Sequence, residues 1–169
     1  MSFLTGKKIV VMGVANKKSI AWGCAQELIQ QGAEVIYTYQ NERMAKSLVK
    51  LVGEEPFMVA CDVADDQSIQ SAFEQIKSYA GEIHGVVHAI AYANKEDLQG
   101  KVIEISRQGY ALAQDISSYS FIAVTKYAKP ILAENSGIVT LTYLGAERAV
   151  PNYNMMGIAK AALESSVRY

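Results

Sequence analysis

Two tyrosines and a lysine, Tyr143, Tyr153 and Lys160, are the residues of this sequence best suited to chemistry. They follow an apolar run at 138–142 that is typical of a strand. Lys160 lies seven residues after Tyr153, nearly two turns of a helix, so we expect both side chains on one helix face. A lysine ammonium there would favour negative charge that develops near the phenol. The alternative is a tyrosine packed on the core and a lysine that points to water.

A turn near the N-terminus is a candidate for binding a dinucleotide. It begins at Gly13 and leads to Ser19 and Ile20, where a helical pattern starts. The turn lacks the G-x-G-x-x-G fingerprint, because only Gly13 and Gly23 are glycines. A glycine at a strand end still permits a tight turn, and a helix N-terminus offers N–H groups to a pyrophosphate, with the Ser19 hydroxyl as a further donor. A plain strand-to-helix turn is the alternative.

Polar residues also end the next two predicted strands. Gln40 stands where dinucleotide enzymes place an acid for the ribose 2′-OH or an arginine for a 2′-phosphate. Its neutral amide favours NADH, while Arg43 keeps NADPH as an alternative. Asp62 could accept from an adenine amino group, with the Val63 N–H on a ring nitrogen. The alternatives are a solvent-facing glutamine and an aspartate that caps the third helix or its turn.

Strands and helices alternate along the whole sequence. We predict strands at 7–13, 34–39, 56–61, 83–90 and 138–142, and helices at 19–32, 42–52, 66–80, 106–132 and 154–169. Such alternation indicates right-handed crossovers and a parallel sheet with helices on both faces. We therefore predict a Rossmann-like, doubly wound, three-layer α/β/α domain with strand order 3-2-1-4-5, which binds ligands at the carboxyl ends of its strands.

Composition narrows the functional classes. The 169 residues carry a net charge of −1, with 50% hydrophobic residues, which predicts one globular domain over 1–169. We expect no nucleic-acid or membrane partner, since the chain has no basic block, signal peptide or apolar run of about 20 residues. A cytoplasmic location follows, with Cys24 and Cys61 as free buried thiols. No spacing indicates a metal site, and we assign catalysis to neither His84 nor His88.

The predicted last helix reaches Tyr169 without a stop signal, and no sixth strand follows it. The fifth strand would then form an open edge of the sheet. We therefore expect that the chain lacks the C-terminal part of its fold.

Four segments together closely resemble the bacterial NADH-dependent enoyl-[acyl-carrier-protein] reductases, a divergent branch of the short-chain dehydrogenase/reductases. The segments are 13–21, 88–94, 114–120 and 142–160, and the resemblance covers the chain from the first predicted strand to the fifth helix. The discriminating feature is the Tyr-x₆-Lys spacing of Tyr153 and Lys160. Ordinary members of the superfamily use Tyr-x₃-Lys after a catalytic serine. Here position 157 is Gly157, which argues against a carbonyl or alcohol dehydrogenase, and Tyr143 stands in the region of that serine.

The resemblance implies reduction of the trans-2 double bond of an acyl thioester in fatty-acid elongation. Tyr153 would hydrogen-bond the thioester oxygen as it becomes negative, Lys160 would hold the nicotinamide ribose, and Tyr143 would lie beside the acyl chain. The cofactor positions, for NADH rather than NADPH, would be Gly13, Ser19, Ile20, Gln40, Asp62, Val63, Ile90 and Lys160. The substrate positions would be Ala93, Tyr143 and Tyr153.

The resemblance also implies an acyl carrier protein as partner and a homo-oligomer, since complete members form homotetramers. Complete members continue with a strand, a segment that closes over nicotinamide and substrate, and a last strand. We therefore expect the 169-residue chain to be weakly active or inactive by itself. A non-catalytic NAD(H)-binding fragment or assembly subunit is the alternative function.

Overall fold

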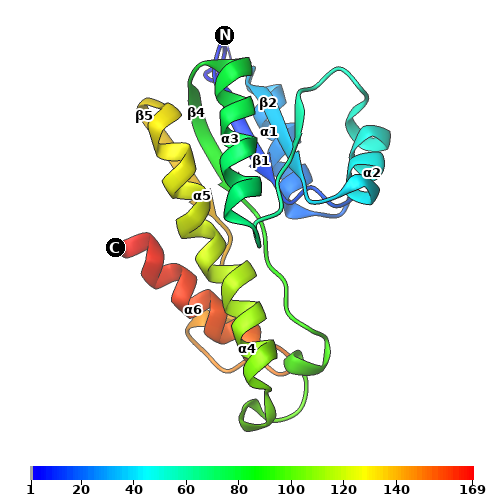
Figure 1. Ribbon diagram of the computed structural model, residues 1–169, viewed down its shortest axis with the longest axis vertical. Coiled ribbons are helices and arrows are strands. Elements are labelled where there is room, and N and C mark those ends of the chain that lie inside the picture. The colour runs from blue at the N-terminus through cyan, green and yellow to red at the C-terminus, as the bar shows by residue number, and fades with distance from the viewer. Residues whose placement is uncertain (1) are drawn as a thin grey trace. The chain divides into compact units, whose positions relative to one another are not determined.

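The computed structural model describes residues 2–169 (Figure 1). These residues form two compact units. The first, here called the sheet unit, contains the described residues up to Ala89 together with Thr125–Thr140. The second, the helical unit, contains Ile90–Val124 and Leu141–Tyr169. Each unit holds some of the predicted site residues.

The sheet unit is built on five parallel strands. They are β1 (Lys8–Met12), β2 (Glu34–Tyr39), β3 (Met58–Ala60), β4 (Ile83–His88) and β5 (Leu132–Thr140). Their order is β3-β2-β1-β4-β5, with every neighbouring pair parallel, which confirms the predicted topology. The β-branched residues of β1, β2 and β4 are buried on both faces, as is typical of a parallel sheet covered by helices.

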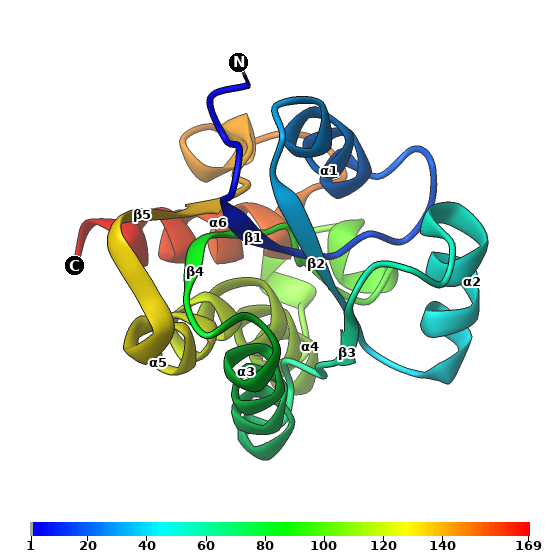
Figure 2. The same cartoon turned by 90° about the horizontal axis from the view of Figure 1, so that it is seen from above.

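Alternate residues of the strands pack against different helices. Ile9 and Val11 face a core that includes alanines from α1 (Ile20–Gln30) and a leucine from α2 (Glu42–Val52). The intervening residues of β1 are also fully buried. Helix α3 (Asp66–Ala80) contributes a buried stripe of its own. Figure 2 shows α1 and α3 on opposite sides of β1 and β2, so helices cover both faces of the sheet.

Two helices of this unit have the predicted boundaries because capping residues fix both of their ends. The side chain of Asn41 accepts from the Met44 N–H at the start of α2, and that of Asp65 accepts from the Gln67 N–H at the start of α3. Gly53 and Gly81, both at positive φ, follow the last residues of these helices.

The predicted helix at 106–132 is wrong in its details. The structure has α4 (Arg107–Gln114), a π-helical segment η3 (Asp115–Tyr119), α5 (Ser120–Ala128) and a 3₁₀ turn η4 (Lys129–Ile131). Pro130, which has no N–H to donate, lies in that turn and explains why α5 ends at Ala128.

The predicted fifth strand is also wrong in its boundaries. β5 begins at Leu132 instead of residue 138 and ends at Thr140 instead of residue 142. Its pairing with β4 shifts register between Ile83 and Gly85, and Asn135 within it has φ +61°. The residues before position 138 are largely polar or small, so the apolar run from which the strand was predicted does not include them.

The helical unit packs α4 against α6 (Asn154–Arg168). One buried hydrophobic cluster of the unit consists of Ala113, Met155, Met156 and Ala159. Three 3₁₀ turns complete the unit: η1 (Glu96–Leu98), η2 (Val102–Glu104) and η5 (Leu144–Ala146).

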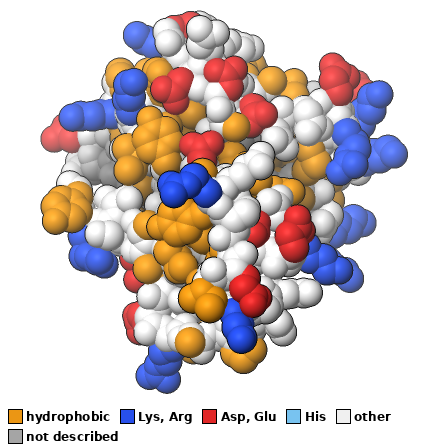
Figure 3. Space-filling view, turned by 60° about the horizontal axis from the view of Figure 1, so that its bottom comes forward, with side chains coloured by type: hydrophobic (Ala, Val, Ile, Leu, Met, Phe, Trp, Pro, Cys, Tyr) orange, Lys and Arg blue, Asp and Glu red, His pale blue; other side chains and the backbone are white. Residues whose placement is uncertain are grey.

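Side chains of both charge signs are interspersed over the face shown in Figure 3, in keeping with the net charge of −1. None of the helices in residues 2–169 is both long and apolar enough to cross a membrane. The same residues contain no group of three or more His, Cys, Asp or Glu side chains that could hold a metal ion.

Candidate functional site

The carboxyl edge of the sheet brings together Gly13, Gln40 and Asp62. Gly13 and Gln40 directly follow β1 and β2, and Asp62 lies two residues after β3. The carboxyl ends of parallel strands share one edge of the sheet. The Gln40 side-chain amide donates to Asp62 Oδ2 over 3.4 Å. Two of the predicted cofactor residues are thus hydrogen-bonded to each other, although they are far apart in the sequence.

Gly13 is required by the backbone as well as by its neighbours. Its φ is +92°, and a Cβ built on it would overlap the carbonyl oxygen of Ala89. Any other residue would therefore be strained and would push apart the chain segments that follow β1 and β4.

The loop between Gly13 and α1 leaves the helix N-terminus open to an anion. Ser19 occupies the predicted N-cap position, but its hydroxyl donates to the Asn16 carbonyl over 2.6 Å, and no side-chain hydrogen bond caps this helix in the described structure. The first turn of α1 carries no acidic residue, whereas those of α2 and α3 each carry one. Ile20 is 66% exposed at this end. Free N–H groups and the helix dipole suit a phosphate group there.

Asp62 lies in a turn between β3 and α3. Its Oδ1 accepts from the Ala64 N–H at 3.1 Å, and its own N–H donates to the Ser68 hydroxyl at 2.9 Å. The interpretation of Asp62 as the N-cap of α3 is wrong, because Asp65 caps that helix. The alternative of a turn aspartate is confirmed, and the side chain of the next residue, Val63, is buried.

The two histidines differ in their surroundings. His88, fully buried at the end of β4, has Nδ1 3.0 Å from the Thr140 hydroxyl, which in turn donates to the His88 carbonyl. These bonds tie the ends of β4 and β5 together. Nδ1 of His84 accepts from the Lys8 N–H, next to the start of β1.

In the helical unit, Tyr143 and Tyr153 form a ring pair. Their centroids are 4.8 Å apart with an interplanar angle of 61°, an edge-to-face arrangement. Tyr153 lies at the N-cap of α6 and Tyr143 at the N-cap of η5. Burial and the nearby Tyr143 raise the pKa of Tyr153 above its usual 10.0, so the phenol keeps its proton at neutral pH.

Lys160 is buried rather than exposed. Only 6% of the residue is accessible, and its Nζ donates to the Leu141 carbonyl oxygen over 2.6 Å. Burial lowers its pKa from the usual 10.5. The alternative of a lysine that points to water is therefore wrong. The ammonium instead sits beside the backbone that leads from β5 to Tyr143.

Ile90 and Ala93 lie on the segment after β4, where a serine that the sequence analysis missed holds the backbone. The hydroxyl of Ser117, which is fully buried in η3, accepts from the Tyr92 N–H and donates to the Tyr92 carbonyl, both at 2.9 Å. A serine inside a helical pattern gave no signal of this role.

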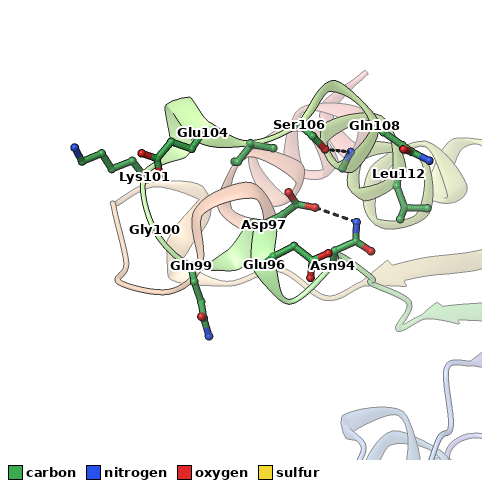
Figure 4. A pocket seen from close by; sticks show the side chains of 12 residues that line it. Asn94, Glu96, Asp97, Gln99, Gly100, Lys101, Glu104, Ser106, Gln108 and Leu112 are labelled. Atoms are coloured by element: carbon green, nitrogen blue, oxygen red, sulfur yellow. Dashed lines mark hydrogen bonds between the residues drawn. The ribbon is translucent and has the colours of Figure 1, made fainter.

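A polar pocket of about 690 Å³ between the 94–106 segment and α4 was also missed (Figure 4). Figure 4 shows the side chains of Asn94 and Asp97 turned toward each other, with 3.0 Å between Asn94 Nδ2 and Asp97 Oδ2. Asp97 is 6% exposed and lies against Gly109, where any Cβ would overlap its carboxylate. Asn154 ties this segment to α6, since its amide donates to the carbonyls of Gln99 and Gly100.

The parallel sheet, with polar residues at the carboxyl ends of its strands, places the protein in the Rossmann-like class of α/β proteins. The helix after β5 adds a tyrosine at its N-cap and a buried lysine two turns later. The chain belongs to the family whose model is described as enoyl-(acyl carrier protein) reductase, which matches residues 13–169.

The chain is 68% identical over 167 residues to the NADH enoyl-[acyl-carrier-protein] reductase FabI of Enterococcus faecalis, covering 99% of this chain and 67% of that protein. It is 49% identical to the NADPH enoyl-[acyl-carrier-protein] reductase FabI of Staphylococcus aureus, over 98% of this chain and 66% of that protein. The crystal structure of the Bacillus cereus enoyl-acyl carrier protein reductase with NADP+ and indole naphthyridinone matches with a TM-score of 0.96 at 50% identity. The match covers 100% of this chain and 67% of that one. The chain thus spans about two thirds of the length of these relatives.

Proposed function

We propose that this protein is an enoyl-[acyl-carrier-protein] reductase, which reduces the trans-2 double bond of an acyl thioester with a reduced nicotinamide cofactor. The observation that carries the proposal is the half-buried Tyr153 followed, two helical turns later, by the buried ammonium of Lys160. Membership of the enoyl reductase family supports the same conclusion.

Tyr153 would stabilise the charge that the reaction creates. A bound reduced nicotinamide would supply a hydride to the β-carbon, which leaves enolate charge on the thioester oxygen. The raised pKa of Tyr153 keeps its phenol protonated, so it can donate a hydrogen bond to that oxygen as the charge develops. A proton from water at the α-carbon would complete the saturated product. Tyr143, whose ring packs edge-on against Tyr153, would lie beside the acyl chain with Ala93.

Lys160 would hold the nicotinamide ribose. An ammonium has three N–H donors, and one of them serves the Leu141 carbonyl. The other two are available to ribose hydroxyls. The positive charge also favours the developing enolate, an effect that is larger in a buried environment than in water.

The cofactor would bind along the strand ends through Gly13, Ser19, Ile20, Gln40, Asp62, Val63 and Ile90. The open N-terminus of α1, with Lys17 and Lys18 just before it and no acid in its first turn, suits the pyrophosphate. The Asp62 carboxylate beside the Gln40 amide would repel a 2′-phosphate, so we propose NADH over NADPH. Relatives that are named for each cofactor exist.

The same proposal includes the substrate carrier, the oligomeric state, the location and the domain organisation. The substrate would be carried by an acyl carrier protein, and the working form would be a homotetramer in the cytoplasm. Residues 1–169 would serve as a single dinucleotide-binding domain.

The test compares three measurements on the purified chain: NADH affinity, oxidation of NADH with crotonyl thioester, and oxidation of NADH with an acetoacetyl thioester. An enoyl reductase binds NADH and reduces only the crotonyl compound. Binding of NADH without turnover would favour the non-catalytic NAD(H)-binding alternative. Reduction of the acetoacetyl ketone would instead indicate a carbonyl dehydrogenase.

A further inference from the structure

Two glycines bring η5 and the first turn of α6 into direct backbone contact. A Cβ built on Gly157 would lie 2.6 Å from the carbonyl oxygen of Gly145, a distance that real Cβ atoms do not adopt. A Cβ built on Gly145 would overlap the ring of Tyr153, with 2.7 Å to Cε1. The atoms in the way belong to backbone and to a half-buried ring, so they have little freedom to move aside.

The conformation of the chain does not explain these glycines. Neither Gly145 nor Gly157 has a positive φ, whereas Gly13 and Gly53 do. Gly23 also lies inside an α-helix, but a Cβ built on it would meet no atom within 4 Å. Gly145 and Gly157 are therefore required by the closeness of two segments, at a cost in helix propensity for Gly157.

The contact sets the geometry of the two tyrosines. Tyr143 is the N-cap of η5 and Tyr153 the N-cap of α6, so each ring is carried by one of the two touching segments. If either glycine gained a side chain, η5 would move away from α6. The 4.8 Å edge-to-face pair would then open, and the Tyr153 ring would lose the surface of Gly145 on which it rests.

The contact between Gly145 and Gly157 also limits the positions on α6 that a lysine can occupy. A residue on α6 shares the face of Tyr153 when it lies about one turn later, at 156 or 157, or about two turns later, at 160. Position 157 is closed to every side chain by the Gly145 carbonyl. Position 156 holds the buried Met156, and the lysine on that face stands at position 160.

We propose that Gly145 and Gly157 are positioning residues for Tyr153, and that their contact excludes a lysine four residues after the tyrosine. This inference rests on the enoyl reductase function proposed above. It adds to that function a pair of residues that act by positioning Tyr153.

The experiment substitutes Gly157→Ala and Gly145→Ala, with Gly23→Ala as the matched control. We expect kcat with crotonyl thioester to fall about 100-fold in the first two variants, since a displacement near 1 Å has an effect of that size. KM for NADH should change less than about twofold, because the cofactor residues are untouched. Gly23→Ala should keep both constants. Equal loss in kcat and NADH affinity, or no loss in either, would overturn the proposal.

Two measurements test the contact of Gly145 with Tyr153 and Gly157 without relying on catalytic activity. In the wild-type chain, ring currents of Tyr153 should displace the NMR chemical shifts of the Gly145 α-protons, and Tyr153→Leu should remove the displacement. In folded Gly157→Ala, the pKa of Tyr153, titrated by absorbance against Tyr153→Phe, should return toward 10.0. Unshifted Gly145 protons would overturn the inference even if the alanine variants failed to fold. A wild-type chain that shows the ring-current shift but neither binds NADH nor turns over crotonyl thioester would refute the proposed function and leave the contact established.

Discussion

The ammonium of Lys160 is buried and donates a hydrogen bond of 2.6 Å to the carbonyl oxygen of Leu141, the first residue after β5. This bond anchors α6 to the segment that leads to Tyr143. It also keeps a positive charge in a place where burial disfavours it, as the lowered pKa of Lys160 indicates.

The lowered pKa predicts a specific dependence of stability on pH. Between the folded pKa of Lys160 and its usual 10.5, the unfolded chain binds the proton more readily than the folded chain. The free energy of unfolding should therefore fall as pH falls through this window and rise as pH increases toward 10.5. Urea unfolding of the wild type and Lys160→Met at several pH values isolates this contribution, because other titrating groups are common to both. A difference between the two that stays constant with pH would contradict the prediction.

A comparison of two glycines separates backbone strain from steric contact. Gly53 and Gly13 both have positive φ, +83° and +92°, but only Gly13 has an atom in the place of a Cβ. Gly53→Ala should destabilise by about 1–2 kcal/mol through backbone strain. Gly13→Ala should destabilise by a further ~1–3 kcal/mol because it collides with the Ala89 carbonyl. Thermal unfolding of both variants measures the difference, and equal losses would show that the Ala89 contact is unimportant.

The two free thiols should differ in reactivity. Burial and the charge of Asp62 raise the pKa of the buried Cys61 to about 12, while Cys24 is half-buried. At pH 8, about one Cys61 in ten thousand would then be a thiolate, the reactive form. Cys24→Ser should react with a disulfide reagent only after unfolding, whereas Cys61→Ser should react in the native state. Rapid native labelling of Cys24→Ser would show that Cys61 is accessible.

Cofactor preference should respond to Asp62. The wild type should bind NADH more tightly than NADPH, because the Asp62 carboxylate lies next to Gln40. Asp62→Asn removes that charge, which at hydrogen-bonding range in a solvated site is worth about 1 kcal/mol. The ratio of the two dissociation constants should therefore change about fivefold in favour of NADPH. The ratio cancels any general loss of adenine binding, so an unchanged ratio would exclude Asp62 as the source of the preference.

The order of the strands and the boundaries of α2 and α3 were predictable because local chemistry decides them. Short apolar runs define β1 and β2, and Asn41, Asp65, Gly53 and Gly81 mark helix ends with side-chain or glycine caps. Local patterns of this kind do not depend on what packs against them.

The features that were not predicted depend on contacts between segments that are distant in the sequence. The hydrogen bond between Gln40 and Asp62, the bonds of Ser117 to Tyr92 and the burial of Lys160 exist only once the chain has folded. The start of β5 was missed for a similar reason, since its first residues pair with β4 through a register shift. The roles of Gly145 and Gly157 became visible only when η5 and α6 were seen in contact.

The most direct test of the central claim is the turnover of crotonyl thioester with NADH by the wild type, Tyr153→Phe and Tyr143→Phe. Each substitution removes one hydroxyl from the same edge-to-face ring pair, so the two variants are matched in their effect on packing. We predict that Tyr153→Phe lowers kcat by about 100-fold or more, as for loss of one oxyanion donor, and that Tyr143→Phe has a much smaller effect. Turnover that survives in Tyr153→Phe, or that is lost equally in both variants, would contradict the assignment of Tyr153 as the donor to the enolate oxygen.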